Sequence, residues 1–256
     1  MIHSSAIIDP AARLAEDVTV GPFSTIGADV EIGRGSVIGS HVVVKGPTTI
    51  GENNQIFQFA SVGEDPQDKK YQGEVTRLEI GDNNVIREGC TLNRGTAQDR
   101  GMTSIGDGNL IMAYVHIAHD CVVKNNTILA NNVALAGHVT IEDFAILGGY
   151  TLVHQFCVIG SYAFTAMGSV LPKDVPPYVL VSGHMAKPFG LNIEGLKRRG
   201  FSSETIRDLR RAYKLIYKAG ITIEQASQQM RDLNPASDEI AVLADFIQKS
   251  QRGIVR

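Results

Sequence analysis

Residues 20–39 read VGPFSTIGADVEIGRGSVIG, and in this stretch an aliphatic residue followed by glycine recurs at every sixth position. The same step of six meets an aliphatic side chain at each position across residues 2–62. The register returns over residues 80–92, slips by one residue, and then holds across residues 105–159. A period of six fits neither a helix of 3.6 residues per turn nor a simple alternating strand. It is typical of short strands joined by tight turns.

The repeat predicts a mainly β fold, a left-handed parallel β-helix of hexapeptide repeats. Three hexads make one triangular coil of 18 residues, and successive coils stack at the strand spacing of about 4.8 Å. Each aliphatic side chain then points inward and lies on its counterpart in the next coil. We expect the glycine that often follows it to serve a turn that needs a positive φ.

The cysteines test this register. Each lies four residues after an aliphatic position, in a slot that elsewhere holds small inward-facing side chains: Cys90, Cys121 and Cys157. We therefore expect three buried thiols that fill the core. Cys121 and Cys157 lie two coils apart, or roughly 9.6 Å at the strand spacing, which is too far for a disulfide.

Two domains are expected. The β-helix occupies residues 1–186 and is interrupted by polar loops near 64–77 and 94–104, which we expect to be functional rather than disordered. Residues 190–256 have a helical pattern and form a C-terminal α-helical domain, expected to cover the open end of the β-helix. The helix start and stop signals are Gly220 at a helix end, a capping box at Thr222 and Gln225, and Ser237 before the last helix.

The two domains differ in charge. Residues 190–256 carry 12 Lys/Arg against 8 Asp/Glu, whereas the first 189 residues carry 12 against 19. A net charge of −3 argues against nucleic acid as a partner, and the asymmetry suggests that the two parts meet different partners. No apolar run reaches the ~18 residues of a membrane helix, and the N-terminus lacks a signal-peptide pattern. We therefore expect no membrane insertion and a cytoplasmic protein.

A cluster of polar side chains, HIAHD, stands in the middle of the repeat. Stacking in steps of 18 places Gly137 over His119 and His138 over Asp120, so these four residues are expected at one corner of the prism. Three interpretations are open: local hydrogen bonding at a turn, a metal site built on the His-x-x-His pair, and acid–base catalysis by a histidine beside a carboxylate. The convergence of His119, Asp120 and His138 favours catalysis.

Several motifs of the chain occur together in one known family. They are HIAHDC, LAGHV, VHQFC, NRGT, the first loop GEDPQDKKYQGEVTRLEIGD and, above all, PFGLNIEGLKRRGFS. With the hexapeptide repeat, they make the sequence similar to the UDP-N-acetylglucosamine acyltransferases over its whole length. The resemblance implies an enzyme, an O-acyltransferase that moves an (R)-3-hydroxyacyl chain from acyl carrier protein to the glucosamine 3-hydroxyl of UDP-N-acetylglucosamine, the first step of lipid A biosynthesis.

The resemblance also implies a homotrimer with active sites between neighbouring β-helices. It implies no metal and no cofactor, since acyl carrier protein is a co-substrate. In the family pattern, His119 matches the general base, Asp120 the carboxylate that orients its ring, and Gly137 the position whose backbone N–H stabilises the oxyanion. Further residues match positions that contact substrate: Asp68, Lys70, His116, His138, His154, Gln155, Met167, Arg198 and Arg199.

Some of these matches carry a more specific expectation. Lys70 is a counter-charge for a diphosphate, and the pair Arg198–Arg199 is associated with substrate phosphates or the carrier protein. Met167 matches a position that limits the length of the acyl chain; the alternative is that it fills an irregular gap near the helical domain. Asn93 and Lys69 depart from the family pattern, and both bear on nucleotide binding.

Three rival functions remain open at this stage. A related UDP-acyl-glucosamine N-acyltransferase shares the scaffold but carries an extra N-terminal domain, whereas the repeat here begins at Ile2. A noncatalytic β-helix would not need the polar cluster around His119. A hydratase of the carbonic anhydrase type would need metal ligands.

Overall fold

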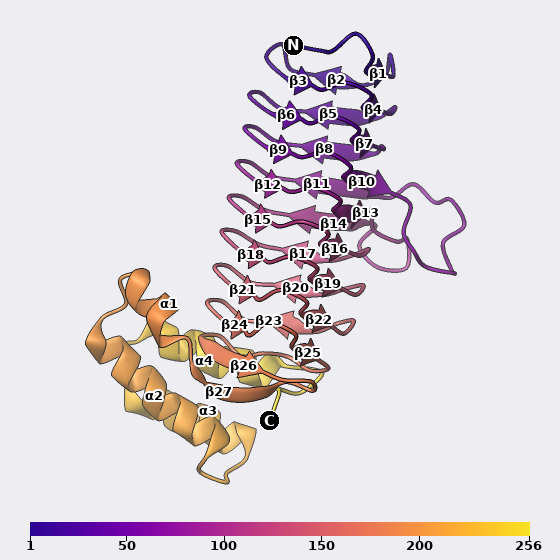
Figure 1. Ribbon diagram of the computed structural model, residues 1–256. Helices are drawn as coiled ribbons and strands as arrows, with labels where there is room; N and C mark the ends of the chain where they lie inside the picture. Colours follow the sequence, from indigo (N-terminus) through magenta and orange to yellow (C-terminus); the bar gives the residue numbers. More distant parts are fainter.

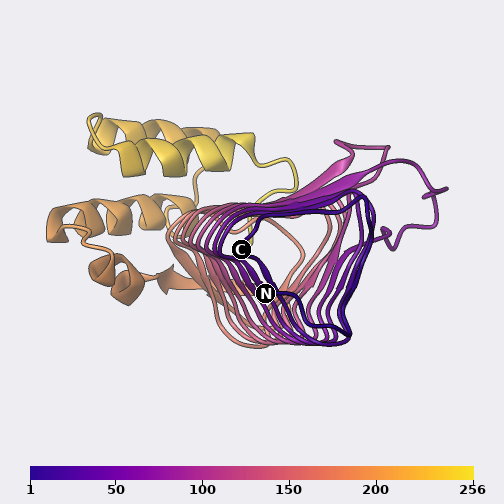
Figure 2. The same cartoon turned by 90° about the horizontal axis from the view of Figure 1, so that it is seen from above.

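The computed structural model describes residues 1–256, and most of the chain forms a long stack of coils (Figure 1). Seen along the stack, the coils have a triangular outline, with helices beside one part of it and two loops extending from a corner (Figure 2). Each side of the triangle is one sheet, and its strands come from successive coils. The mainly β fold predicted from the repeat is confirmed.

Sheet 1 contains nine strands, all paired in parallel. Its central register pairs Ile117 with Leu92 on one side and with Leu135 on the other, so the predicted stacking of aliphatic residues is confirmed. Its strands are β1 (Ile7–Ile8), β4 (Thr25–Ile26), β7 (Val43–Val44), β10 (Ser61–Glu64), β13 (Thr91–Asn93), β16 (His116–Ile117), β19 (Ala134–Leu135), β22 (Leu152–Val153) and β25 (Val170–Leu171).

Sheet 2 follows sheet 1 along the chain and contains eight parallel strands. They are β2 (Arg13–Leu14), β5 (Val30–Ile32), β8 (Thr48–Ile50), β11 (Arg77–Ile80), β14 (Met102–Ile105), β17 (Val122–Val123), β20 (Thr140–Ile141) and β23 (Val158–Ile159). The chain therefore passes from sheet 1 to sheet 2 at one corner, which we call the 1–2 corner.

Sheet 3 completes the triangle with ten strands, of which only the last pair is antiparallel. They are β3 (Thr19–Val20), β6 (Val37–Ile38), β9 (Gln55–Ile56), β12 (Val85–Ile86), β15 (Leu110–Ile111), β18 (Ile128–Leu129), β21 (Ile146–Leu147), β24 (Phe164–Thr165), β26 (Val179–Ser182) and β27 (Lys187–Leu191). The chain returns from sheet 3 to sheet 1 at the 3–1 corner.

Both polar loops leave the prism at the 1–2 corner. The first connects β10 to β11, and the second connects β13 to β14. Across them the strands keep their register although more than 18 residues separate the partners: Val62 pairs with Leu92, and Leu92 with Ile117. The loops are therefore insertions into single turns that leave the stack of coils intact.

The helical domain lies beside the last coils (Figure 1). The predicted capping box of Thr222 and Gln225 and the predicted cap at Ser237 are confirmed. The hairpin of β26 and β27 and the short first helix were not predicted, because neither shows a repeat or a long apolar period. The helices are α1 (Ile193–Arg198), α2 (Ser203–Tyr217), α3 (Ile223–Leu233) and α4 (Asp238–Lys249).

No helix of the chain combines the length and the apolar character that a membrane span requires.

The three cysteines are free and buried, as predicted. Burial raises the pKa of the thiols to about 11 in Cys90, about 12 in Cys121 and about 11 in Cys157. Because the thiolate is the reactive form, these residues fill the core and are poor nucleophiles.

The glycine that follows the aliphatic residue has a different role from the one predicted. Among these glycines only Gly63 has a positive φ, of 75°; the left-handed residue of a turn is usually the third after the aliphatic position, as in Asp120 (φ 60°). A Cβ at Gly33 would lie 2.7 Å from the backbone carbonyl carbon of Gly51 in the next coil. Close approach of the coils, and not backbone conformation, therefore requires glycine at most of these positions.

This explanation predicts different outcomes for two glycines at the same repeat position. In Gly33→Ala the new Cβ meets backbone atoms at 2.7 Å, whereas in Gly27→Ala the nearest atom, the carbonyl oxygen of Val44, is 3.4 Å away. We expect Gly33→Ala to lower the free energy of unfolding by about 1–3 kcal/mol, as overpacking does, and Gly27→Ala to have little effect. Urea unfolding of both variants checks this, and equal losses would contradict it.

Candidate active site

The polar cluster lies at the 1–2 corner, where successive turns stack. Residues 118–121 connect β16 to β17, and residues 136–139 connect β19 to β20 one coil further along. The backbone N–H of His138 donates to the carbonyl of His119 at 3.0 Å, which fixes the two turns against each other. The predicted placement of His119, Asp120, Gly137 and His138 at one corner is thereby confirmed.

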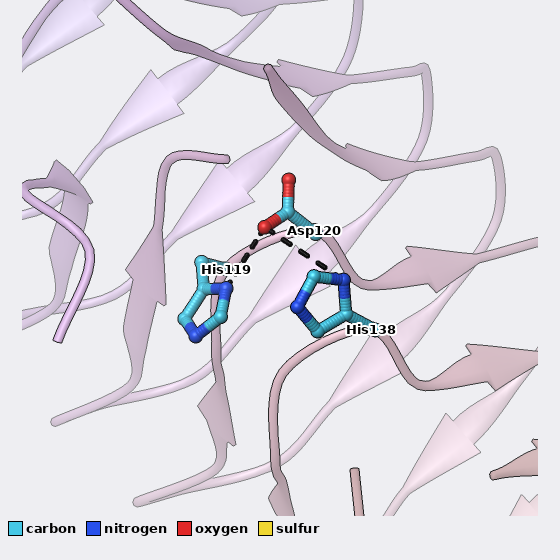
Figure 3. Close-up of side chains that lie close together, drawn as sticks. All are labelled: His119, Asp120 and His138. Atoms are coloured by element: carbon cyan, nitrogen blue, oxygen red, sulfur yellow. Dashed lines mark hydrogen bonds and ion pairs between the residues drawn. The ribbon is translucent and has the colours of Figure 1, made fainter. Parts of the chain in front are cut away.

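His119 and Asp120 form a hydrogen-bonded pair (Figure 3). The Nδ1 atom of His119 lies 2.8 Å from Oδ2 of Asp120. The carboxylate is fully buried, while 13% of the His119 side chain is exposed. The ring therefore has one nitrogen held by a carboxylate, and its Nε2 is left for another partner, the arrangement of a general base with an orienting acid.

Asp120 is held by the second loop. The backbone N–H of Thr96 donates to Oδ1 at 2.9 Å and the Thr96 hydroxyl donates to Oδ2 at 2.7 Å, while the backbone N–H of Asp120 donates to the hydroxyl of Thr103 at 2.8 Å. Burial opposes ionisation of Asp120, but the hydrogen bonds from His119 and Thr96 outweigh it and hold the pKa of this carboxyl below its usual value. Asp120 is therefore an anion at neutral pH.

His138 has a carboxylate partner of its own. Its Nδ1 lies 2.7 Å from Oδ2 of Asp99 in the second loop and 3.9 Å from Oδ2 of Asp120. Its ring stacks on Phe156, with centroids 4.3 Å apart, and lies nearly perpendicular to the His119 ring, with centroids 5.1 Å apart. The site therefore contains two adjacent imidazoles, each hydrogen-bonded through Nδ1 to a different carboxylate.

Gly137 provides the space that the His119 ring occupies. A Cβ at Gly137 would lie 2.5 Å from Cε1 of His119, so any side chain here would displace the imidazole. The carbonyl of Gly137 accepts from the backbone N–H of Phe156, but its own N–H donates to no group of the chain. Gly137 therefore lies directly against the His119 ring and has a backbone N–H without an acceptor in the chain.

The metal interpretation rested on the His-x-x-His pair. His116 does not join His119: it lies on β16, and its Nδ1 is 2.7 Å from the hydroxyl of Thr91. Burial, followed by the charge of His119, lowers the pKa of His116. The donor atoms within 4.8 Å of one another are instead those of His119, Asp120 and His138. In this trio the Nδ1 atoms of both histidines are already hydrogen-bonded to carboxylates.

The two loops are joined to each other at the 1–2 corner. The buried guanidinium of Arg94 forms an ion pair with Asp65 and donates to the hydroxyl of Tyr71 at 3.1 Å. Next to it, the Asn93 side chain donates to the carbonyl of Asp65 at 2.6 Å. Asn93, which departs from the family pattern, therefore has a role in fixing the first loop.

The first loop carries two predicted substrate contacts. The backbone N–H of Lys70 donates to the carboxylate of Asp68 at 2.9 Å, and the ammonium of Lys70 is exposed, as is Lys69. The loop leaves the same corner as the His119 turn. The two ammonium groups therefore belong to a loop at the corner that carries His119, and both are exposed to an anion in solution.

Other predicted site residues lie further away. His154 and Gln155 are exposed in the turn one coil beyond Gly137. Met167 lies in the turn between β24 and β25, at the 3–1 corner rather than the 1–2 corner. Met167 is 81% exposed, so the alternative that it fills an irregular gap near the helical domain is wrong.

Arg198 and Arg199 lie at the end of α1. The Arg199 guanidinium stacks over the ring of Phe144 at 4.6 Å, whereas Arg198 is exposed and has no ion-pair partner. Within one chain neither residue reaches the cluster around His119.

Four residues of the site were not predicted: Arg94, Thr96, Asp99 and Phe156. Phe156 lies 18 positions after His138, so the stacking rule that brought His138 to Asp120 also gives its place. Arg94, Thr96 and Asp99 belong to an insertion, for which a repeat gives no position. The NRGT motif was the only signal in the sequence that pointed to two of them.

Family models match both parts of the chain. The model described as UDP N-acetylglucosamine O-acyltransferase, domain 2, matches residues 174–255. The model described as bacterial transferase hexapeptide (six repeats) matches residues 11–46 and 102–137.

Curated and solved proteins match the whole chain. Acyl-(acyl-carrier-protein)–UDP-N-acetylglucosamine O-acyltransferase from Thiobacillus denitrificans is 58% identical over 255 residues, covering 100% of this chain and 99% of the relative. The enzyme of the same name from Ectopseudomonas mendocina is 60% identical with the same coverage. The structure of LpxA from Acinetobacter baumannii is 55% identical, with a TM-score of 0.98, and covers 100% of this chain and 99% of that chain.

The lowered pKa of Asp120 predicts a pH-dependent loss of stability. A carboxyl whose pKa is lower when folded stabilises the protein above its unfolded pKa of about 3.9, and this contribution is lost as the pH falls through the folded value. We expect wild type to be more stable than Asp120→Asn at pH 6, with the difference shrinking as the pH falls below about 4. Urea midpoints measured from pH 6 to pH 3 check this; a difference that does not change with pH would contradict it.

Proposed function

The chain belongs to the UDP-N-acetylglucosamine O-acyltransferase family, and from this membership we propose that it transfers an (R)-3-hydroxyacyl chain from acyl carrier protein to the glucosamine 3-hydroxyl of UDP-N-acetylglucosamine, the first step of lipid A biosynthesis. The observation that carries the proposal for this chain is the hydrogen bond between Nδ1 of His119 and the buried carboxylate of Asp120.

In the proposed mechanism, His119 is the general base. Asp120 accepts a hydrogen bond from the Nδ1–H of His119. The lone pair of the neutral ring is therefore on Nε2, which can take the proton of the sugar hydroxyl. The sugar oxygen then attacks the thioester carbonyl carbon. The imidazolium formed in this step is stabilised by Asp120, which Thr96 keeps in place through two hydrogen bonds.

The attack converts the carbonyl oxygen into an oxyanion, for which we propose Gly137 as the donor. Its backbone N–H has no acceptor within the chain and lies beside the His119 ring. When the intermediate collapses, the carbon–sulfur bond breaks and His119 returns its proton to the leaving thiolate. The ester and the free thiol of the carrier are the products, and neither a metal nor a cofactor takes part.

Some of the proposed substrate contacts lie at the same corner. Lys70 offers a cation to the diphosphate, and the hydrogen bond from its backbone to Asp68 fixes the loop that carries both. His116, His138, His154 and Gln155 match substrate-contacting positions of the family, and we propose them as further contacts to the substrates. We propose the arginine pair at 198–199 as a contact to substrate phosphates or to the carrier protein.

We further propose that the chain acts as a homotrimer. None of its five main cavities, of about 230 to 460 Å³, is lined by His119, Asp120 or His138. A site that must hold a sugar nucleotide and an acyl chain needs a cleft, which a second β-helix beside the 1–2 corner would supply. The buried, unpaired cysteines are compatible with a reducing compartment, and we propose a cytoplasmic location.

A metal-dependent hydratase is the second candidate, favoured by the three donor atoms of His119, Asp120 and His138 that lie within 4.8 Å. Metal analysis of the purified protein separates the two. A stoichiometric ion that is needed for activity would support the hydratase; full acyl transfer by the metal-free protein would support the acyltransferase.

The first prediction for this function concerns the base. We expect His119→Ala to remain folded, because the residue lies at a turn outside the apolar core, and to lose about 10²–10⁴-fold in kcat, as the loss of a general base typically does. Formation of the acylated UDP-sugar, followed by mass spectrometry, measures this. Circular dichroism and gel filtration serve as controls for folding and assembly. Turnover equal to wild type would refute the mechanism.

The second concerns the carrier protein, an acidic partner. On α2, Arg207 and Arg211 are paired with acidic neighbours. Arg210, Lys214 and the C-cap residue Lys218 follow one another at four-residue spacing without ion-pair partners. We expect reversal of Arg210 and Lys214 to glutamate to raise the KM for the acyl carrier about tenfold while the KM for the UDP-sugar is unchanged.

Lys249→Glu on α4 serves as a charge-reversal control on another helix; its ammonium differs from those on α2 in lying 3.7 Å from Oδ2 of Asp245. If the α2 variant raised the KM for the acyl carrier and the KM for the UDP-sugar equally, these side chains would have a structural role.

The third concerns the acyl chain. Met167 is exposed at the 3–1 corner, so in the proposed trimer it limits a chain held at the His119 site of a neighbouring copy. Met167→Gly is then expected to favour longer chains: two further methylenes at about 0.8 kcal/mol each correspond to a shift of roughly tenfold in relative kcat/KM. A panel of hydroxyacyl carrier proteins measures this, and an unchanged order of preference would place the limit elsewhere.

A further inference from the structure

One oxygen of Asp120 lies within reach of both histidines. Oδ2 is 2.8 Å from Nδ1 of His119 and 3.9 Å from Nδ1 of His138 (Figure 3). It also accepts the hydroxyl proton of Thr96. The first distance is a hydrogen bond and the second is not, yet a movement of about 1 Å would make His138 a competitor for the acceptor that orients His119.

The His138 ring is restrained in its plane but not in its choice of acceptor. Phe156 stacks on one face at 4.3 Å with an interplanar angle of 10°, and the His119 ring lies nearly perpendicular to it, with the two centroids 5.1 Å apart. Stacking opposes tilting of the ring. It does not prevent a slide within the plane, nor a half-turn about the Cβ–Cγ bond, which exchanges Nδ1 with Cδ2 and Nε2 with Cε1, because the apolar contact is nearly the same in both orientations.

Asp99 is the second carboxylate that can accept a hydrogen bond from His138. Its Oδ2 lies 2.7 Å from Nδ1 of His138, and the carboxylate has no other side-chain partner. The neighbouring Arg100 does not neutralise it, since that guanidinium donates to the carbonyl of Asp120 at 3.1 Å and to that of Met102. No cation of the chain therefore competes with His138 for the Asp99 carboxylate, which is 38% exposed.

We propose that Asp99 is a positioning residue that keeps the Nδ1 proton of His138 away from Asp120, so that Asp120 serves His119 alone. This assignment rests on the proposed function of His119. It also fixes the tautomer of neutral His138: Nδ1 carries the proton, and Nε2, which is directed toward the His119 ring in Figure 3, is left as an acceptor facing the site.

The proposal predicts the behaviour of three variants. Asp99→Ala removes the acceptor, so His138 turns to Asp120 and the bond between His119 and Asp120 is partly lost. Asp99→Asn keeps a carbonyl oxygen that can accept the hydrogen bond from Nδ1–H of His138. It is expected to keep most of the hydrogen bonding between His119 and Asp120. Glu52→Gln, which removes an exposed carboxylate at another corner of the prism, is the matched control.

The first measurement does not depend on catalysis. With ¹⁵N-labelled histidine, the ring nitrogens of the seven histidines are assigned with single His→Gln variants, and their tautomers are read at neutral pH. We expect wild type and Asp99→Asn to have His138 protonated on Nδ1, and Asp99→Ala to change the signals of both His138 and His119. Unchanged signals in Asp99→Ala overturn the proposal whether or not the chain transfers acyl groups.

The second measurement is kinetic. We expect Asp99→Ala to lower kcat about tenfold, the size of effect that corresponds to one hydrogen bond to a charged group, with little change in the KM for the UDP-sugar. A loss confined to KM, or a full kcat in a variant whose signals have changed, overturns the role of Asp99 in the reaction. Failure of wild type to transfer acyl groups would refute the proposed function instead, and the tautomer measurement would still decide the assignment of Asp99.

Discussion

Every coil must lie at hydrogen-bonding distance from the next one on all three sides of the prism. The bonds from the N–H of His138 to the carbonyl of His119, and from the N–H of Phe156 to that of Gly137, are two links of such a ladder. Since each coil repeats the turns of the previous one, residues 18 positions apart lie over each other. Side chains at the turns therefore form columns, and the neighbours of a functional residue are fixed by the coils before and after it.

The columns at the 1–2 corner explain the composition of the site. Gly137 lies over His119 and leaves room for the ring, where any Cβ would come within 2.5 Å of it. Asp120 and His138 both occupy the left-handed position of their turns, with φ of 60° and 65°. This conformation costs an L-residue about 1–2 kcal/mol and is most accessible to aspartate and asparagine. Stacking between coils offsets that cost and holds the carboxylate and the two rings in register.

The 18-residue spacing of the repeat accounts for the parts of the fold and of the site that could be predicted from the sequence. It gave the sheets, the inward aliphatic columns, the buried cysteines and the meeting of His119 with Asp120 and His138, because all of these depend on the 18-residue spacing. It did not place Thr96 or Asp99, which belong to an insertion and approach the corner from outside the coil. The role of the repeated glycines was misjudged for a related reason: the pattern gives the position of a small residue, but whether backbone conformation or a neighbouring coil requires it depends on three-dimensional packing.

The same geometry limits what one chain can do alone. A convex corner exposes His119 to solvent on one side, and the chain offers no main cavity around it. Met167, on the 3–1 corner, is separated from His119 by the whole width of sheet 1. If the corner of one copy faces a different corner of the next, the contact is heterologous, and it closes only as a ring. In the trimer proposed for this chain, such a ring of three copies would place the residues around His119 of one copy beside side chains of another.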